Sequence, residues 1–290
     1  MSADHVILTR FNLPSVGVES LIRAHDGWLR ARVELFEHYC LPSVRAQSDL
    51  DFSWIIYFDP ESPAWLMEWI DTQRDEGIFH PVFRASVSTP QLLSDISELI
   101  GTPRSWLMTT NLDNDDAIAL DFVARLHAIA PPTERTAVYL SNGLIASQDD
   151  LYLRTDRHNA FCSVIEPWDR PVTCWADWHN RLNLQMKVLS IGGAPAWLQV
   201  IHGSNVSNRV RGRLVSPAAY RGLFGNLLAE APAPGRSKIA RDRIVTGPAR
   251  FTRETVRATA KWGAVRLFGT SGLDRIKLRL AHASRPTGGG

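Results

Sequence analysis

The sequence from residue 52 reads Phe52-Ser-Trp-Ile-Ile-Tyr-Phe58, an almost unbroken apolar run that ends at the turn-forming pair Asp59-Pro60. A strand with one wet face alternates apolar and polar residues, whereas a continuous run is typical of a strand buried on both faces. Such strands belong to mainly parallel sheets that carry helices on each side. The segment therefore predicts a central strand of an α/β protein.

Further apolar runs alternate with stretches of helical spacing along the chain. We expect strands at 5–11, 77–83, 106–110, 137–140, 151–154, 160–165 and 197–201, and helices within 17–39, 64–76, 91–100 and from 117 to about 130. This alternation predicts an open, doubly wound α/β sheet with helices on both faces. Ligands bind such sheets at the carboxyl ends of the strands.

Composition confines the chain to globular proteins. It has 290 residues, of which 44% are apolar and 21% charged, and this balance excludes disordered, collagen-like and coiled-coil classes. No apolar run approaches the ~18 residues of a membrane span, and no signal peptide is visible. The three cysteines, Cys40, Cys162 and Cys174, exclude a cysteine-rich metal site and suit a reducing compartment. We therefore expect a cytoplasmic protein.

The charge is distributed unevenly. Residues 1–234 hold 19 Lys+Arg and 27 Asp+Glu, a net of −8, whereas residues 235–290 hold 13 and 3, a net of +10. The break falls at Ala231-Pro-Ala-Pro-Gly235, which has the composition of a linker. We predict a main domain at 1–234 and a basic helical C-terminal region at 235–290.

Within the basic region, residues 251–268 have helical spacing, with Arg253, Arg257 and Lys261 on one face. A cationic amphipathic helix suits an anionic membrane surface, here the inner face of the cytoplasmic membrane. Packing against the acidic main domain is an equal alternative. Nucleic acid is an unlikely partner, because the main domain would repel phosphate and no binding module is recognisable.

Three carboxylates in four positions, Asp113, Asp115 and Asp116, follow the predicted strand at 106–110. A helix N-cap needs one or two acidic residues, and three repel one another unless a cation or strong donors compensate. Mn²⁺ or Mg²⁺ prefers such oxygen ligands and also binds phosphate. An EF-hand fails because Ile118 and Ala124 stand where Gly and an acid are needed. An aspartyl-phosphate phosphatase would also place Asp-x-Asp after a strand, but no convincing set of a downstream lysine and an acidic partner follows, so this alternative ranks low.

Other polar residues come at predicted strand ends. Arg10 and Asn12 end the first strand, and Arg10 can neutralise a phosphate. Asp59 ends the second strand and can accept hydrogen bonds from a nucleoside. Ordinary loop caps are the alternative. His202 follows the strand at 197–201 and can reach a metal or pyrophosphate. Trp175 and Trp178 can stack on a sugar or pack in the core.

Four stretches stand in a telling order and spacing along the chain: Thr9-Arg-Phe-Asn12, Tyr39-Cys-Leu-Pro-Ser-Val44 with Gln47, the run at 52–59, and Leu112-Asp-Asn-Asp-Asp-Ala-Ile118. Together they resemble the putative rhamnosyltransferase family of bacterial GT-A glycosyltransferases. The resemblance covers roughly residues 5–210 and implies a GT-A fold with an Asp-x-Asp metal motif.

The resemblance also implies roles for single residues. Asp113 and Asp115 match the metal motif, with His202 as a late metal or phosphate ligand, and Asp59 matches the nucleoside acid. Thr9, Arg10, Asn12, Asn114 and Asp116 are further candidates for binding the nucleotide-sugar. The catalytic base has no firm motif; Glu166 is our first candidate, followed by Asp177 and His179.

Two function classes follow. The first is a metal-dependent glycosyltransferase that moves a sugar, rhamnose by the family label, from a nucleotide-diphosphate donor to a surface-polysaccharide or glycolipid acceptor. The second is a non-catalytic nucleotide- or carbohydrate-binding protein on the same fold. The sequence does not choose between an inverting and a retaining reaction.

Overall fold

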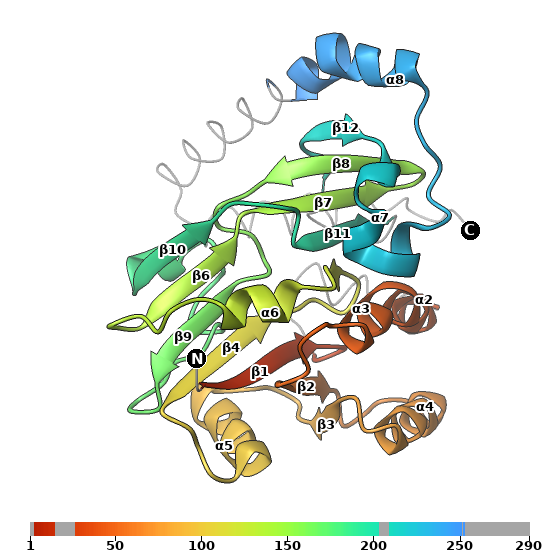
Figure 1. Cartoon of the computed structure of the whole chain (residues 1–290). Helices are drawn as coiled ribbons and strands as arrows, with labels where there is room; N and C mark the ends of the chain where they lie inside the picture. The colour runs from red at the N-terminus through yellow and green to blue at the C-terminus, as the bar shows by residue number, and fades with distance from the viewer. Residues whose placement is uncertain (1–2, 15–26, 203–208, 251, 253–290) are drawn as a thin grey trace, which may run out of the picture.

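The structure is a computed structural model and describes residues 3–14, 27–202, 209–250 and 252. Its main sheet has seven strands in the order β10-β6-β9-β4-β1-β2-β3. These strands are β1 (Ala3–Arg10), β2 (Ser53–Phe58), β3 (His80–Phe83), β4 (Trp106–Asn111), β6 (Thr136–Leu140), β9 (Ser163–Pro167) and β10 (Lys187–Ile191). All neighbours pair in parallel except β9, which is antiparallel to both β4 and β6. The predicted mainly parallel sheet is confirmed (Figure 1).

The central strand β1 shows why this sheet is covered on both faces. Ile7 packs into one apolar cluster and its neighbours Val6 and Leu8 pack into another, and all three side chains are fully buried. Successive strand residues point to opposite faces, so a continuous apolar run needs helices on both. The first face receives α4 (Ala64–Asp75) and α6 (Phe122–His127), and the second receives α5 (Thr89–Ile100).

The helix predicted within 17–39 is described from residue 27 onward. It runs through α2 (Trp28–Leu35), a π-helical turn η1 (Phe36–Cys40) and α3 (Leu41–Arg45). Pro42 has no backbone N–H and cannot continue the regular α-helical hydrogen bonds, which explains the wider turn before it. Residues 15–26, and with them the first half of this prediction, lie outside the described part.

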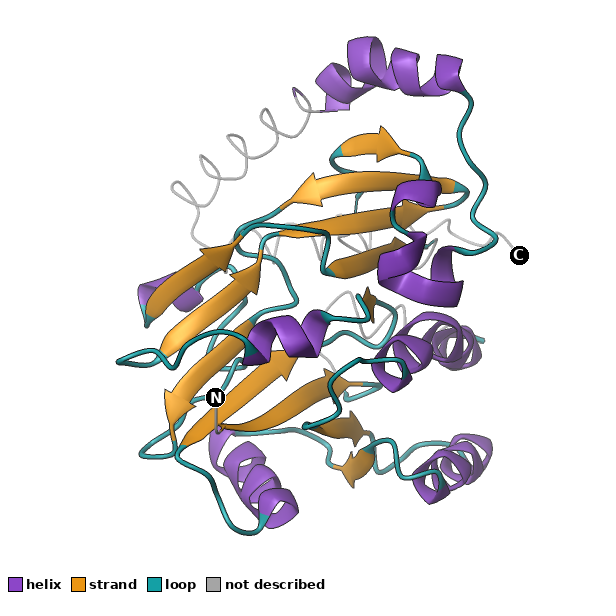
Figure 2. Ribbon diagram, in the orientation of Figure 1, coloured by secondary structure: helices purple, strands orange, loops and turns teal. Residues whose placement is uncertain are grey.

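A second sheet was not predicted. Its order is β12-β8-β7-β11-β5, formed by β5 (Ala117–Ile118), β7 (Asn142–Ser147), β8 (Asp150–Thr155), β11 (Trp197–Ile201) and β12 (Arg213–Val215). The prediction that a helix begins at residue 117 is therefore wrong. There the chain pairs with β11, and α6 begins only at Phe122. Figure 2 shows this smaller sheet beyond the end of the main one.

The second sheet packs its own apolar cluster. Leu144, Leu198 and Phe224 are buried in it, with Phe224 supplied by α7 (Arg221–Phe224). Gly143 passes directly against Trp197, whose ring stacks on Phe161 with centroids 5.1 Å apart. A Cβ at position 143 would lie 2.0 Å from Trp197 Cδ2, so the close approach requires glycine.

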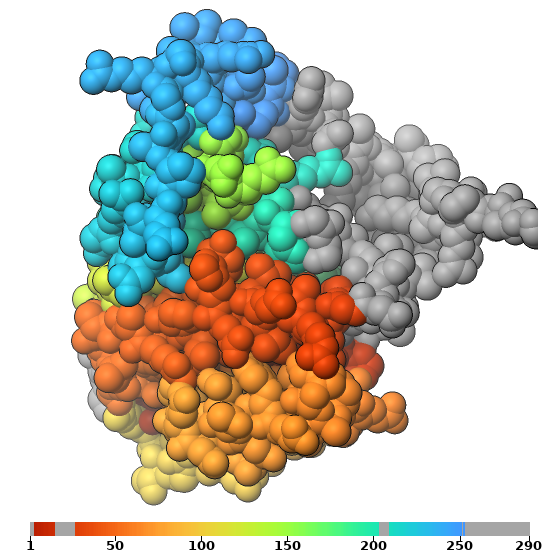
Figure 3. Space-filling view, turned by 90° about the vertical axis from the view of Figure 1, so that its right-hand side faces the viewer, coloured from red at the N-terminus to blue at the C-terminus, as the bar shows by residue number. Residues whose placement is uncertain are grey.

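The remaining described helices, all after residue 180, are short. They are η2 (Leu182–Leu184), η3 (Pro217–Ala219), η4 (Gly225–Leu228), α8 (Arg236–Arg241) and η5 (Asp242–Thr246). Figure 3 shows the blue segment of α8 and η5 at one end of the molecule, with the α2 and α3 region toward the middle.

Hydrogen bonds to Asp242 link the α8–η5 segment to β12. The carboxylate is buried and accepts hydrogen bonds from Leu214 N at 2.9 Å, Thr246 Oγ1 at 2.7 Å and Arg250 Nη2 at 2.6 Å. Residues 236–250 thus pack against the main part of the chain. The division at 234 and 235 stays a prediction, and the helix predicted at 251–268 lies outside the described residues, apart from Thr252.

Candidate functional site

The acidic turn, Asp113–Asp116, follows β4 at the carboxyl ends of the parallel strands. Two hydrogen bonds hold Leu112, the residue directly before the turn: Leu112 N donates to Leu8 O at 3.1 Å, and Thr9 Oγ1 donates to Leu112 O at 2.8 Å. Thr9 also accepts from Trp54 Nε1 at 2.9 Å and is fully buried. We therefore correct its assignment: Thr9 positions the turn and does not face a nucleotide.

The three carboxylates of the turn have different surroundings. Asp113 is exposed and accepts from Asn111 Nδ2 at 3.3 Å. Asp115 is buried, and its Oδ2 lies 2.6 Å from Arg32 Nη1 and 2.9 Å from His202 Nε2. Asp116 is buried and accepts from the backbone N–H of Val200 at 2.8 Å. Asp116 therefore joins the turn to β11, away from the exposed edge.

Electrostatics separate the same carboxylates. The side chain of Asp113 reaches solvent, but the protein atoms around it remove much of its hydration. This desolvation, together with the charge of Asp115, raises the pKa of Asp113. Burial raises the pKa of Asp116 well above its usual range, with Asp115 and Asp113 adding to the effect. Burial opposes the charge of Asp115 too, but the bond to His202 and the charge of Arg32 hold its pKa below the ordinary value. Asp115 is thus the stable anion of the turn.

Two asparagines predicted to bind the donor act inside the protein. Asn114 Nδ2 donates to Phe11 O at 2.6 Å, and its Oδ1 accepts from Arg32 Nη1 at 3.1 Å. Asn12 Oδ1 accepts from Asp59 N at 3.0 Å, which ties the end of β1 to the loop after β2. Both side chains are buried, and they shape this edge of the sheet.

Asp59 stands at the end of β2, as predicted. It is half-buried, and its Oδ1 accepts from Glu61 N at 2.9 Å, which closes a local turn. This bond uses one lone pair of one oxygen. Asp59 stays a candidate for a nucleoside hydroxyl, placed beside Asn12 at the same edge.

Arg10 and Trp175 form a stacked pair at this edge. The guanidinium carbon of Arg10 lies 3.9 Å from the centroid of the Trp175 ring, and Trp175 Nε1 donates to Asn111 Oδ1 at 2.8 Å. Asn111 also contacts Asp113, so the pair lies beside the acidic turn. A planar cation held flat on an aromatic ring presents its N–H groups at its rim, where phosphate oxygens can bind.

The first candidate for the catalytic base is corrected by the structure. Glu166 lies on β9 with its side chain fully buried. Its Oε2 accepts from Arg135 Nε at 2.6 Å and Val172 N at 3.0 Å, and its Oε1 accepts from Thr173 N at 2.8 Å. Both oxygens are occupied, so this carboxylate fixes the following loop and is not accessible to an acceptor hydroxyl.

Asp177 and His179 lie on the loop that also carries Trp175. Asp177 Oδ1 accepts from Trp178 N at 2.8 Å and its Oδ2 from Gln185 Nε2 at 3.1 Å, with the side chain still half-buried. Burial lowers the pKa of His179, which keeps the imidazole neutral near pH 7. Trp178 is 72% exposed and therefore not part of the core. Both residues stay candidates for the base.

The structure thus assembles part of the predicted site. Asp115 and His202 are in contact, Asp113 lies at the same turn, and Arg10 stands beside it. Sequence reasoning missed Arg32, because a single arginine within a helix has no distinguishing pattern. It also missed Asn111, although its place as the last residue of β4 marked it as an edge residue.

A comparison of the sequence with protein-family models identifies one family. The model of the family described as "Putative rhamnosyl transferase" matches residues 4–214, more than two thirds of the chain. No curated protein matches the sequence.

Three solved structures illustrate the similarity. S. aureus TarS 1-349 in complex with UDP has a TM-score of 0.41 and 7% identity, covering 68% of this chain and 60% of that one. A putative nucleotide-diphospho-sugar transferase from Desulfovibrio desulfuricans G20 has a TM-score of 0.35 and 10% identity, with coverages of 69% and 82%. The inositol-1-phosphate CTP transferase from T. maritima has a TM-score of 0.36 and 10% identity, covering 80% of this chain and 99% of that one.

The family match rests on the same segment that builds the site. Its range includes β1, the acidic turn, the loop of Trp175 and the end of β11. The chain therefore belongs to the putative rhamnosyl transferase family of glycosyltransferases.

Proposed function

We propose that this glycosyltransferase takes its sugar from a nucleotide-diphosphate donor, with rhamnose as the sugar that the family description suggests. The observation that carries the proposal is the meeting of Arg10, Trp175 and the acidic turn at the carboxyl edge of β1 and β4. Open α/β sheets bind ligands at this edge. A stacked guanidinium there suits the phosphates of a donor.

The reaction defines what this edge must do. The bond between the anomeric carbon and the diphosphate oxygen breaks, and its electron pair stays on the departing nucleoside diphosphate. The acceptor hydroxyl forms the new glycosidic bond and loses its proton. Arg10 stabilises the negative charge that develops on the leaving group. In an inverting reaction Asp177 or His179 takes the proton.

The predicted Mn²⁺ or Mg²⁺ does not fit the arrangement of the side chains. Two carboxylates and an imidazole are chemically suitable ligands. Among the described residues, however, no three His, Cys, Asp or Glu side chains are grouped so that they could hold a metal ion. Oδ2 of Asp115 already contacts both Arg32 and His202. The metal prediction is therefore not used in the reaction above.

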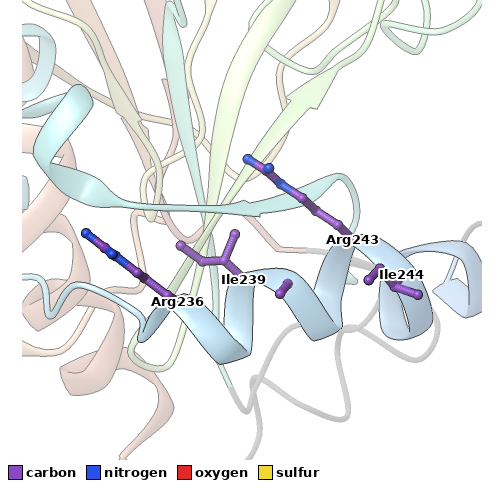
Figure 4. A pocket seen from close by; sticks show the side chains of 5 residues that line it. Arg236, Ile239, Arg243 and Ile244 are labelled. Atoms are coloured by element: carbon purple, nitrogen blue, oxygen red, sulfur yellow. The ribbon is translucent and has the colours of Figure 1, made fainter.

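The acceptor is proposed from the charge of the C-terminal region. Within the described part of the chain, every helix is too short or too polar to span a bilayer. On α8 and η5, Arg236 and Arg243 flank Ile239 beside an open hollow of about 430 Å³, and Ile244 is 76% exposed (Figure 4). This hollow contains no residue of the acidic turn. We propose that this cationic surface contacts anionic lipid and brings the site near a glycolipid or polysaccharide acceptor.

The membrane contact is tested on the full chain. Replacing Arg236, Arg241 and Arg243 by Gln should release the protein from vesicles of anionic lipid while its thermal unfolding stays unchanged. Vesicles of neutral lipid serve as the control. Equal binding of the wild-type chain and the variant to anionic vesicles would overturn this part of the proposal.

The transferase function is tested by release of nucleoside diphosphate from UDP-, GDP- and dTDP-sugars in the presence of glycan acceptors. The wild-type chain should turn over one donor class, and Asp115→Ala should lose turnover. Asp149→Ala, at an exposed position outside the site, is the matched control. The alternative, a non-catalytic binding protein, predicts that the wild-type chain binds a nucleotide or sugar without any turnover.

A further inference from the structure

We propose that the guanidinium of Arg32 takes the place that a divalent cation would occupy on Asp115, so that this chain binds its nucleoside diphosphate without a metal ion. This inference rests on the proposed function and concerns the same site. It begins from the ion pair between Arg32 and Asp115, which links α2 to the acidic turn.

The position of Arg32 is fixed from several sides. Its Nη1 lies 2.6 Å from Asp115 Oδ2 and donates to Asn114 Oδ1 at 3.1 Å. Asn114 is itself held by Phe11 O, so its amide oxygen points toward Arg32. The Arg32 and Asp115 side chains are only 13% and 9% exposed. A buried pair with this geometry is much harder to separate than a surface pair, because either charge alone would be left desolvated.

The same contacts hinder a cation. Arg32 and His202 both approach Oδ2 of Asp115, one of the two oxygens that this carboxylate could offer to a metal. To bind there, a divalent cation would have to displace two donors and bring a positive ion next to a buried guanidinium. Coulomb repulsion at such distances is large where water is scarce.

The remaining donors of Arg32 suit phosphate. Within the described part of the chain, its two polar contacts both use Nη1, which leaves Nε and Nη2 for another anion. Arg10, stacked on Trp175, provides a second guanidinium at the same edge. Two guanidinium groups carry the charge of one divalent cation, and each can bind two phosphate oxygens in parallel.

The proposal explains why three acidic residues stand together. Asp115 neutralises and orients Arg32, Asp116 joins the turn to β11, and Asp113 is the exposed member of the turn. In this arrangement the acidic motif does not coordinate the donor through a metal. It holds a cationic side chain that binds the donor directly.

The experiment is calorimetric titration of UDP, GDP and dTDP into the full chain, first with EDTA and then with Mn²⁺. The wild-type chain should bind one nucleotide in EDTA, with an affinity that Mn²⁺ changes less than about threefold. Arg32→Gln should weaken that binding by about tenfold or more, which corresponds to ~1.4 kcal/mol or more. Arg32→Lys keeps the charge and should lie between the two.

Arg30→Gln is the matched control, because Arg30 is exposed on the same helix and stacks on Trp65. Its binding should equal that of the wild-type chain. Binding that appears only with Mn²⁺ would overturn the inference and leave the proposed function intact. So would wild-type affinity of folded Arg32→Gln in EDTA. If Arg32→Gln does not fold, the comparison of EDTA with Mn²⁺ still decides. Binding of no nucleotide under either condition would instead contradict the proposed function, and the inference with it.

Discussion

His202 Nε2 lies 2.9 Å from Asp115 Oδ2, and this contact joins two residues that are 87 positions apart and follow strands of different sheets. Asp115 follows β4 of the main sheet, and His202 follows β11 of the second sheet. The second sheet therefore contributes directly to the candidate site, in addition to packing beside it.

This contact predicts that His202→Ala impairs donor binding. Without the imidazole, Asp115 Oδ2 loses its hydrogen bond from His202, and a lost bond to a charged group costs about 1.5–3 kcal/mol. We expect the Kd of the bound nucleotide to rise by about tenfold. His38→Ala, at an exposed position, should leave it unchanged. An unaltered Kd in a folded His202→Ala chain would separate His202 from the site.

Glu166→Gln should reduce stability and leave the turnover of folded molecules intact. Glu166 is fully buried and accepts from Arg135 and two backbone amides, whereas Arg135 is 32% exposed and can be solvated in the variant, so the loss should be about 1–3 kcal/mol. Urea denaturation measures the loss, and initial rates per folded molecule measure turnover. Glu134→Gln, which changes an exposed side chain, should leave both stability and turnover unchanged. A stable variant without turnover would return Glu166 to the candidate bases.

The buried imidazole of His5 predicts acid sensitivity. Burial, followed by the neighbouring His127, lowers its pKa from 6.5 to about 3, although Asp49 and Asp51 act in the opposite direction. Between pH 6.5 and 3 the unfolded chain binds a proton at this position that the folded protein excludes. The free energy of unfolding should therefore fall by about 1.4 kcal/mol for each unit of falling pH from this group.

Chemical denaturation of the wild-type chain and of His5→Gln between pH 7 and 5 checks this sign. Glutamine does not titrate, so the variant should lose less stability per pH unit. If the free energy of unfolding falls equally with pH in both chains, a group other than His5 causes the acid sensitivity. At neutral pH the variant is expected to be less stable, because His5 bonds to His127 at 3.0 Å and Thr110 at 2.8 Å.

Asp242→Ala should release the α8–η5 segment from the second sheet. The carboxylate accepts from Leu214 N, Thr246 and Arg250, and all three donors lose their acceptor in the variant. Limited trypsin digestion with mass spectrometry should show faster cleavage after Arg243. Lys238→Ala removes an exposed ion pair with Asp150 and the trypsin site at 238, and its cleavage after Arg243 should equal that of the wild-type chain. Equal digestion of all three chains would contradict the role of Asp242.

The sequence predicted several strands well because a largely apolar run is a local signal. The strand at 52–58 of the main sheet and the strand at 197–201 of the second sheet were found within one residue of their observed ends. The strands at 142–147 and 187–191 were missed. The first contains Gly143 and the second has polar and exposed positions, so neither shows a continuous apolar run.

The site was harder to predict than the fold. The acidic turn and Arg10 were recognisable because they stand at strand ends. Glu166 also stands near a strand end, but its partner Arg135 and the amides of the following loop are brought to it only by folding. Arg32 could not be predicted from the sequence for the same reason, because its role depends on Asp115, which lies 83 residues further along the chain.

The close approach of Gly143 to Trp197 has a consequence for tracing the ancestry of this fold. The indole ring fills the volume that any side chain at position 143 would need. The two positions can therefore vary only as a pair: a relative with a larger residue at 143 must have a smaller one than tryptophan at 197. Their joint variation across a set of relatives would identify which of them share this junction between the two sheets.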